Sequence, residues 1–132
     1  MLMATRDLRF HQPALVIVVC ALSGVAGAEE KGTPQGLRFF EQKIRPVLVR
    51  QCYQCHSARA ATSGKLKGKL RLDTRAGTRA GGESGPSVVP GKPGDSLLVG
   101  ALRHESFKMP PSGKLPAGVI ADFVTWIKMG AP

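Results

Sequence analysis

Cys52-Tyr53-Gln54-Cys55-His56 is the stretch of this sequence that decides its fold. A Cys-x-x-Cys-His string is typical of the covalent attachment of a c-type haem. Two thiols three residues apart can each bond one vinyl group of the same porphyrin, and the histidine that follows can then bind the iron. Cys52, Cys55 and His56 are therefore predicted to hold one haem c, with His56 as the proximal ligand.

Two other kinds of site use the same residue types. A thioredoxin-like dithiol needs a strand before its first cysteine and a βαβ context, whereas a helical pattern precedes Cys52. A zinc site could take Cys52, Cys55 and either His56 or His104 as three ligands, but a closed structural site needs a fourth. The pattern favours haem over both alternatives.

The N-terminal segment has the pattern of a secretory signal peptide. Basic residues precede an apolar run over residues 13–22, and Ala26-Gly27-Ala28 offers a cleavage site. The run is shorter than the ~20 residues that a membrane span needs, and an uncleaved anchor is the alternative. A lipoprotein is disfavoured because Val19 precedes Cys20 where a small residue is expected. We expect a periplasmic or other cell-envelope location.

These features predict three parts of the chain: residues 1–28 as signal peptide, 29–38 as N-terminal linker and 39–132 as one small domain. Cleavage after Ala28 would remove two of the nineteen basic residues and one of the nine acidic residues, which leaves 104 residues with a net charge of +9. Cys20 would also leave, so that the two cysteines of the motif remain. With no third cysteine, a disulfide scaffold is not expected.

The positive charge bears on the choice of partner. A basic exported protein can dock onto an acidic surface, although a solvated charge without a specific partner explains the composition equally well. Nucleic acid is not expected, because neither a recognition helix nor basic residues interleaved with aromatic ones are visible. Membrane contact is expected only if the N-terminal segment stays uncleaved.

The first of about three predicted helices leads into the motif. Thr33 and Pro34 have the residue types of an N-cap and a first helical position. Apolar residues then recur at spacings of three and four, which indicates an amphipathic helix; they are Phe40, Ile44, Val47 and Leu48. Pro46 interrupts the pattern, and a bend is expected over residues 42–45.

The other two helices lie near the C-terminus. Asp95 is predicted to cap a short helix over residues 96–104. Pro116 is predicted to begin the last helix, with Gly130 as the glycine just beyond its end. Trp126 lies on this last helix and is expected to pack in the core near Phe40 or against the porphyrin edge.

The middle of the chain lacks a regular pattern. Residues 57–79 are strongly basic, and Leu70-Arg71-Leu72 alternates as a short extended piece would. Residues 77–94 are crowded with glycine and proline, which predicts a loop. A compact domain rarely contains so long an irregular stretch unless something else organises it. The apolar faces of a haem would do so.

Met109 is the candidate for the sixth iron ligand. It lies well after the motif in the turn Phe107–Gly113, and Pro110 and Pro111 would stiffen the backbone beside it. A thioether opposite a histidine is a known axial pair that raises the reduction potential. The rivals are His104 and Met129, and the alternative for Met109 is a gap-filling core residue.

An ordered set of motifs resembles the planctomycete-type cytochrome c domain, a class I-like c-type cytochrome. The set comprises the segment Phe39–Leu48, the haem motif, Leu70-Arg71-Leu72-Asp73, Gly81–Pro86, Val89–Pro93, Ser96-Leu97-Leu98, Met109-Pro110-Pro111 and Trp126–Pro132. The haem motif alone is common to all c-type cytochromes, so the order of the whole set carries the resemblance.

The resemblance implies an all-α, small cytochrome c-like fold with long loops around one covalently attached haem. It implies Cys52 and Cys55 as attachment points, His56 as the proximal ligand and Met109 as the distal ligand. The expected function is single-electron transfer between redox partner proteins, without enzymatic activity. Alternatives are a small-ligand sensor or peroxidase-like enzyme with an open sixth site, or an attachment module that haem merely stabilises.

Overall fold

The computed structural model describes residues 32–132, and the predicted signal peptide lies outside this part of the chain. Helices without any strand make up its regular structure, in agreement with the predicted all-α class. The elements are α1 (Pro34–Phe39), the π-helical turn η1 (Phe40–Ile44), α2 (Arg45–Gln51), α3 (Ala58–Thr62), α4 (Arg75–Ala80), the 3-10 turn η2 (Pro93–Asp95), α5 (Leu97–Leu102) and α6 (Ala117–Lys128). Over residues 32–132, no helix is both long and apolar enough to cross a membrane.

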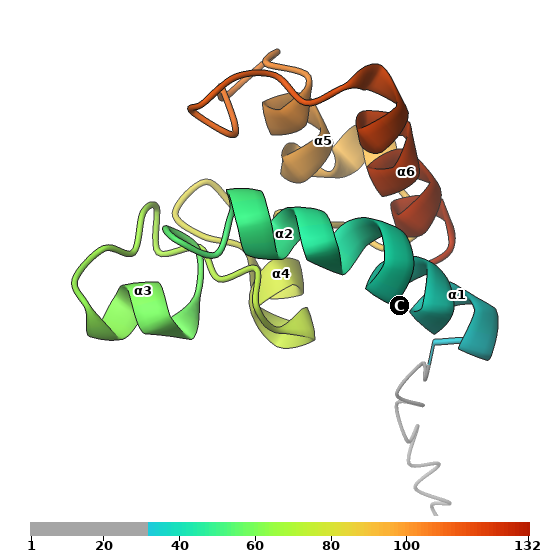
Figure 1. Ribbon diagram of the computed structural model, residues 1–132, viewed down its shortest axis with the longest axis horizontal. Helices are drawn as coiled ribbons and strands as arrows, with labels where there is room; N and C mark the ends of the chain where they lie inside the picture. Colours follow the sequence, from blue (N-terminus) through green and yellow to red (C-terminus); the bar gives the residue numbers. More distant parts are fainter. Residues whose placement is uncertain (1–31) are drawn as a thin grey trace, which may run out of the picture.

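The first helix is continuous from α1 through η1 to α2 (Figure 1). The Thr33 hydroxyl accepts a hydrogen bond from the Gly36 N–H at 3.1 Å, as its predicted capping role requires. The bend expected before Pro46 takes the form of the π-helical turn, in which the Arg45 N–H donates to the Phe40 carbonyl. Pro46 has no N–H to donate, and the wider turn before it lets the helix continue.

The prediction that Asp95 caps the second helix is wrong. Asp95 ends the 3-10 turn η2, and Ser96 is the N-cap of α5. The Ser96 hydroxyl is engaged elsewhere, since it accepts from the Val89 N–H at 2.9 Å and donates to the Lys92 carbonyl at 2.9 Å. The same hydroxyl therefore fixes the loop before α5, and the helix is shorter than predicted.

The C-terminal helix agrees closely with its prediction. Pro116 is the N-cap of α6, so that the helix proper starts one residue later. Met129 is the C-cap, and Gly130 follows it with φ of 89°, the left-handed conformation that a terminal glycine adopts readily.

Two short helices, α3 and α4, lie in the basic segment where no helix is predicted. Each begins with a hydroxyl cap: the Ser57 side chain accepts from Ala60 N–H at 3.1 Å, and the Thr74 side chain accepts from Gly77 N–H at 3.0 Å. They contain five and six residues, which is too few for a helical period to show in the sequence. The alternating Leu70–Leu72 forms neither helix nor strand.

The core forms where α6 packs against η1 of the first helix. Trp126 is 4% exposed, and its ring centroid lies 5.5 Å from that of Phe40 and 6.3 Å from that of Phe123. The Trp126 indole N–H donates to the Pro132 carbonyl at 2.8 Å. This bond helps to place the C-terminus beside α1 (Figure 1). Trp126 is thus a core residue packed on the first helix, one of the two expected positions.

Trp126→Ala is expected to lower the free energy of unfolding by about 3–5 kcal/mol, as large truncations in cores do. The change removes both ring contacts and the hydrogen bond to the C-terminus. Trp126→Phe keeps a ring and should cost less. Urea unfolding followed by circular dichroism measures the effect, with the exposed Met129→Ala on the next turn as control. Equal losses for Trp126→Ala and Met129→Ala would contradict this account of the core.

Candidate cofactor site

The Cys52–His56 motif forms a tight turn at the end of α2. The Cys52 N–H donates to the Leu48 carbonyl at 2.9 Å and so completes the last turn of the helix. The Cys55 and His56 N–H groups then both donate to the Cys52 carbonyl, at 3.1 and 2.9 Å. Cys52 and Cys55 are half-buried free thiols. The helix end therefore presents two thiols and one imidazole from a single compact turn.

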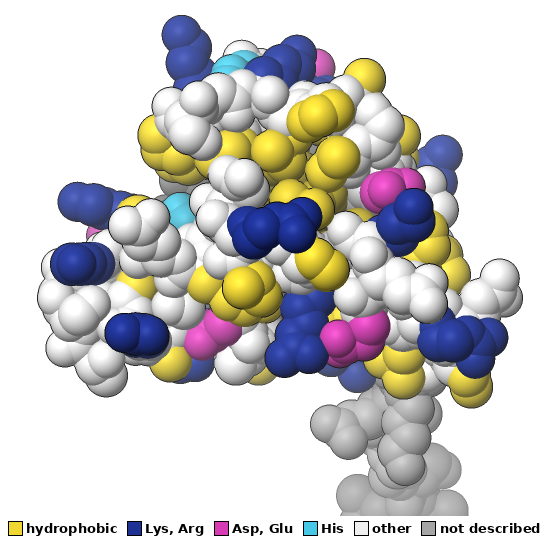
Figure 2. Space-filling view, viewed as in Figure 1, with side chains coloured by type: hydrophobic (Ala, Val, Ile, Leu, Met, Phe, Trp, Pro, Cys, Tyr) yellow, Lys and Arg dark blue, Asp and Glu magenta, His cyan; other side chains and the backbone are white. Residues whose placement is uncertain are grey.

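These side chains line a cavity of about 320 Å³ whose wall is mainly apolar. Its walls come from the motif, from residues 67–72 and 82–87, from α5 and from the loop over residues 107–111. The cavity is within the ~300–1,000 Å³ range typical of ligand sites. Figure 2 shows hydrophobic side chains between the part of the surface over α5 and the first helix, with lysine and arginine side chains around them.

Met109 lines this cavity together with Cys52, Cys55 and His56. Its N–H donates to the Ala101 carbonyl at 3.2 Å, which holds the loop against the end of α5. The rivals His104 and Met129 are absent from the cavity wall, and Met129 is 39% exposed. The structure thus brings the four predicted site residues together and leaves the two rivals outside.

The protonation states of the site suit a metal-binding imidazole. Burial lowers the pKa of His56, and the nearby carbonyls of Leu70 and Lys67 offset part of this effect. His56 is therefore neutral at pH 7, the form that binds metals. Its Nδ1 atom is buried and makes no hydrogen bond. Burial raises the pKa of the Cys52 thiol to about 11.

The two alternative sites find little support. A reactive dithiol depends on a lowered thiol pKa, whereas burial raises that of Cys52, and no strand precedes the motif within the described residues. Among residues 32–132, no group of three or more histidine, cysteine, aspartate or glutamate side chains is arranged to hold a metal ion. The zinc interpretation therefore lacks a ligand set in this part of the chain.

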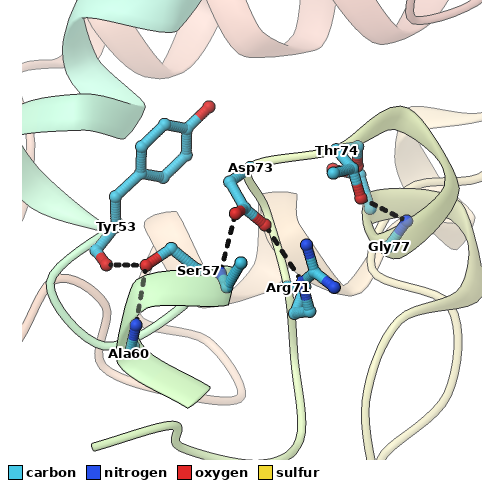
Figure 3. Close-up of polar contacts among 9 residues, drawn as sticks. Tyr53, Ser57, Ala60, Arg71, Asp73, Thr74 and Gly77 are labelled. Carbon is cyan, nitrogen blue, oxygen red and sulfur yellow. Dashed lines mark hydrogen bonds and ion pairs between the residues drawn. The ribbon is translucent and has the colours of Figure 1, made fainter. Parts of the chain in front are cut away.

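A second segment, residues 67–73, runs beside residues 55–58 and is bonded to them at three points. The Lys67 N–H donates to the Cys55 carbonyl at 3.1 Å, and the Leu72 N–H donates to the His56 carbonyl at 2.9 Å. The Asp73 carboxylate accepts from the Ala58 N–H at 2.7 Å (Figure 3). These bonds fix the backbone on both sides of the His56 side chain.

Asp73 is held in its charged form. Burial by itself would raise the pKa of Asp73, but the hydrogen bonds from the Ala58 N–H and the Arg71 guanidinium outweigh burial and lower it. The Arg71 Nε lies 3.3 Å from the carboxylate. Asp73 is therefore ionised at neutral pH and is a strong acceptor for the Ala58 N–H.

A glycine turn closes the cavity wall next to this segment. Gly82 and Gly85 form an isolated antiparallel bridge, and the Glu83 N–H donates to the Gly68 carbonyl at 2.9 Å. A Cβ atom at Gly82 would overlap the Gly68 carbonyl oxygen. The absence of a side chain at Gly82 therefore lets the turn approach the segment beside the motif.

Sequence reasoning missed several residues of this site. Asp73 is the one acidic residue in the basic stretch 57–79, and that isolation is a signal of a structural partner. Phe107 lines the cavity although it is 44% exposed, and its type alone gives no sign of this position. The role of Gly82 depends on a contact with residue 68, which no local pattern reveals.

The residues present fit a haem c. Two thiols on one turn can form the two thioether links, and a neutral imidazole and a thioether share the same apolar cavity. The orphaned Nδ1 of His56 belongs to an imidazole whose other nitrogen would be taken up by iron. The apolar wall suits the porphyrin faces, which need burial from water.

One comparison with known proteins gives a match. Residues 52–113 match the model of the family described as planctomycete cytochrome C. The matched segment begins at the first cysteine of the motif and ends just after Met109, so it contains all four predicted site residues. No curated protein and no solved structure is significantly similar to the chain.

Gly82→Ala is expected to destabilise the protein by ~1–3 kcal/mol, the range of overpacking substitutions, because its Cβ would push the turn away from Gly68. The matched control is Gly94→Ala, since a Cβ there meets nothing within 4 Å and the backbone φ is not positive. Gly94→Ala should be neutral or slightly stabilising. Thermal unfolding of both variants tests the wall, and an equal response would contradict the role given to Gly82.

Proposed function

We propose that this chain, which contains a planctomycete-type cytochrome c domain over residues 52–113, is a monohaem c-type cytochrome that carries single electrons in the cell envelope. The observation that carries the proposal is the shared cavity, in which Cys52, Cys55, His56 and Met109 meet. Among the described residues, these cysteines supply the one Cys-x-x-Cys-His attachment site. The envelope location rests on the N-terminal sequence pattern.

Each site residue has a defined task in this proposal. Cys52 and Cys55 would tether the porphyrin by thioether bonds, and His56 would bind the iron. Met109 would be the second protein ligand of the iron, and its loop is held by the hydrogen bond from the Met109 N–H to the Ala101 carbonyl. When bound, the haem supplies a one-electron iron couple. The mainly apolar wall would shield the porphyrin faces from water.

The pair of protein ligands favours electron transfer over chemistry on a substrate. If His56 and Met109 both bind, no coordination position is left for oxygen or peroxide. A site whose ligands stay in place during the redox change also needs little rearrangement. A sensor or peroxidase-like enzyme would need the Met109 position open, and this difference makes the two classes distinguishable.

We further propose that the redox partners have acidic docking surfaces. Lys67 is exposed, lines the cavity and is bonded through its N–H to the Cys55 carbonyl. The other charged residue of the cavity wall is Glu83, and its carboxylate lies 3.3 Å from the Lys69 ammonium group. The cavity edge therefore keeps a net positive charge that would attract a carboxylate-rich surface.

Met109→Ala should abolish the weak sulfur-to-iron absorption band and open the sixth position. The reduced variant should then bind carbon monoxide at neutral pH, whereas the unchanged protein should resist it. The experiment uses the protein expressed with a haem-attachment system and compares absorption spectra. Removal of the strong-field thioether should also lower the reduction potential, since methionine ligation raises it.

Met129→Ala is the control for this experiment, because Met129 is exposed and lies outside the cavity wall. Its spectrum should match that of the unchanged protein. Retention of the sulfur band in Met109→Ala would contradict the ligand assignment. Carbon monoxide binding by the unchanged reduced protein would favour the sensor or peroxidase-like alternative.

Lys67→Gln should slow the oxidation of the reduced protein by hexacyanoferrate(III) about twofold or more at low salt, because a positive charge at the cavity edge attracts this anion. The difference should shrink at high ionic strength, where the Debye length falls to about 3 Å. Stopped-flow kinetics measure the rates. The exposed Lys114→Gln removes the same charge away from the cavity and should change the rate less; equal effects would remove the case for docking at this edge.

A further inference from the structure

We propose that Asp73 is a positioning residue for the proximal ligand: its carboxylate fixes the backbone after His56, and thereby holds the imidazole in place and contributes to the reduction potential of the iron. This inference rests on the proposed function. Asp73 does not line the cavity, so it would act through the chain that carries His56 and not by contact with the haem.

Asp73 supplies one of the three hydrogen bonds that join residues 55–58 to residues 67–73. Two of these bonds run between backbone groups, at Cys55 and at His56. The third is the 2.7 Å bond from Ala58 N–H to the Asp73 side chain. It is short and has a charged acceptor, which makes it stronger than a bond between neutral groups. The three bonds together form a clasp between the two segments, and Asp73 supplies the bond at its C-terminal end.

Further contacts support both partners of this bond. The Ser57 hydroxyl donates to the Tyr53 carbonyl at 2.6 Å and accepts from the Ala60 N–H, so the residue after His56 is fixed to the motif turn (Figure 3). Ser57 is 5% exposed. The Arg71 guanidinium holds the other oxygen of the Asp73 carboxylate at 3.3 Å. Hydrogen bonds therefore hold the backbone on the C-terminal side of His56 in place.

The segment that Asp73 helps to hold also lies beside the imidazole itself. The carbonyls of Lys67 and Leu70 lie near the His56 ring, and both belong to the segment that Asp73 helps to hold. The surroundings of a ligating histidine orient its ring and tune it as a ligand, and since the His56 Nδ1 makes no hydrogen bond to either carbonyl, this segment acts on the position of the ring. A well-placed imidazole ligand stabilises the ferric state, and so does the charge of a nearby carboxylate. Removal of Asp73 should therefore raise the potential by both routes.

The test is a series of haem-loaded variants at Asp73, compared by spectroelectrochemical titration and by electron paramagnetic resonance of the oxidised form. Asp73→Ala removes the acceptor and the charge, Asp73→Asn keeps an acceptor oxygen for Ala58, and Asp73→Glu restores both with a longer arm. We expect Asp73→Ala to shift the ferric–ferrous equilibrium at least threefold toward the ferrous form, about 28 mV at 59 mV per tenfold change. Asp73→Asn should shift it less, and Asp73→Glu should return toward the starting value.

Glu83→Gln is the matched control, because it removes one carboxylate that lines the cavity and leaves the clasp intact. It should change the potential through charge alone and leave the g-values unaltered, whereas Asp73→Ala should alter them. Equal potentials for Asp73→Asn and Asp73→Ala, or unchanged g-values in both, would overturn the positioning role and leave charge alone.

If Asp73→Ala does not incorporate haem, Asp73→Asn is compared with Glu83→Gln, because the neutral amide weakens the bond to Ala58 and loses the Arg71 ion pair, whereas Glu83→Gln removes charge alone. If Asp73→Asn shifts the potential more than Glu83→Gln does and also alters the g-values, the positioning role is supported. If the two variants behave alike, it is overturned. If the Asp73 variants melt at a lower temperature but keep the potential and the g-values, Asp73 has a structural role only, and the proposal is overturned. Failure of the unchanged protein to attach haem would instead refute the proposed function.

Discussion

The packing of α6 against the first helix is the contact on which the rest of this structure depends. Trp126 and Phe40 join residues more than eighty positions apart in the chain, and the indole N–H also secures the C-terminus. The first helix and α6 thus form a frame, and the chain between the motif and α6 starts at one of these helices and ends at the other. The cavity is therefore built from segments that the frame brings together, and short elements suffice for its walls.

In the segments that form the cavity wall, many backbone hydrogen-bonding groups find their partners within a few residues. Ser57 and Thr74 cap two helices of fewer than seven residues, and the Ser96 hydroxyl fixes the loop before α5. Their large apolar side chains are few, and Leu70, Leu72 and Leu98 line the cavity. Ordering such a chain costs about 1–2 kcal/mol of backbone entropy per residue. A bound porphyrin would supply apolar surface that offsets part of this cost.

Features that depend on residues close together in the chain could be predicted from the sequence, and features that depend on distant residues could not. The first helix and α6 are predictable because their apolar periods and end signals are local and long enough to read. The helices α3 and α4 are too short to show a period, and Asp95 has the residue type of a cap although Ser96 occupies that position. The motif predicted three of the four residues grouped at the cavity, and Met109 followed from its place in the chain. The contributions of Asp73 and Gly82 depend on partners fifteen and fourteen residues away, and no local pattern contains them.

The two proposed iron ligands are held in different ways, and this difference bears on how the site responds to strain. His56 follows directly from the first helix, and its neighbours are bonded to a second segment on both sides. Met109 hangs on a loop whose two ends, at His104 and at Met109, both donate to the Ala101 carbonyl. Phe107 at the middle of that loop is 44% exposed. The histidine side is therefore the rigid half of the site, and the methionine side is the half that would yield first. In the proposed carrier, a bond between the Met109 sulfur and the iron would hold this loop against the cavity. The position of the loop and the ligation that sets the reduction potential would then depend on each other.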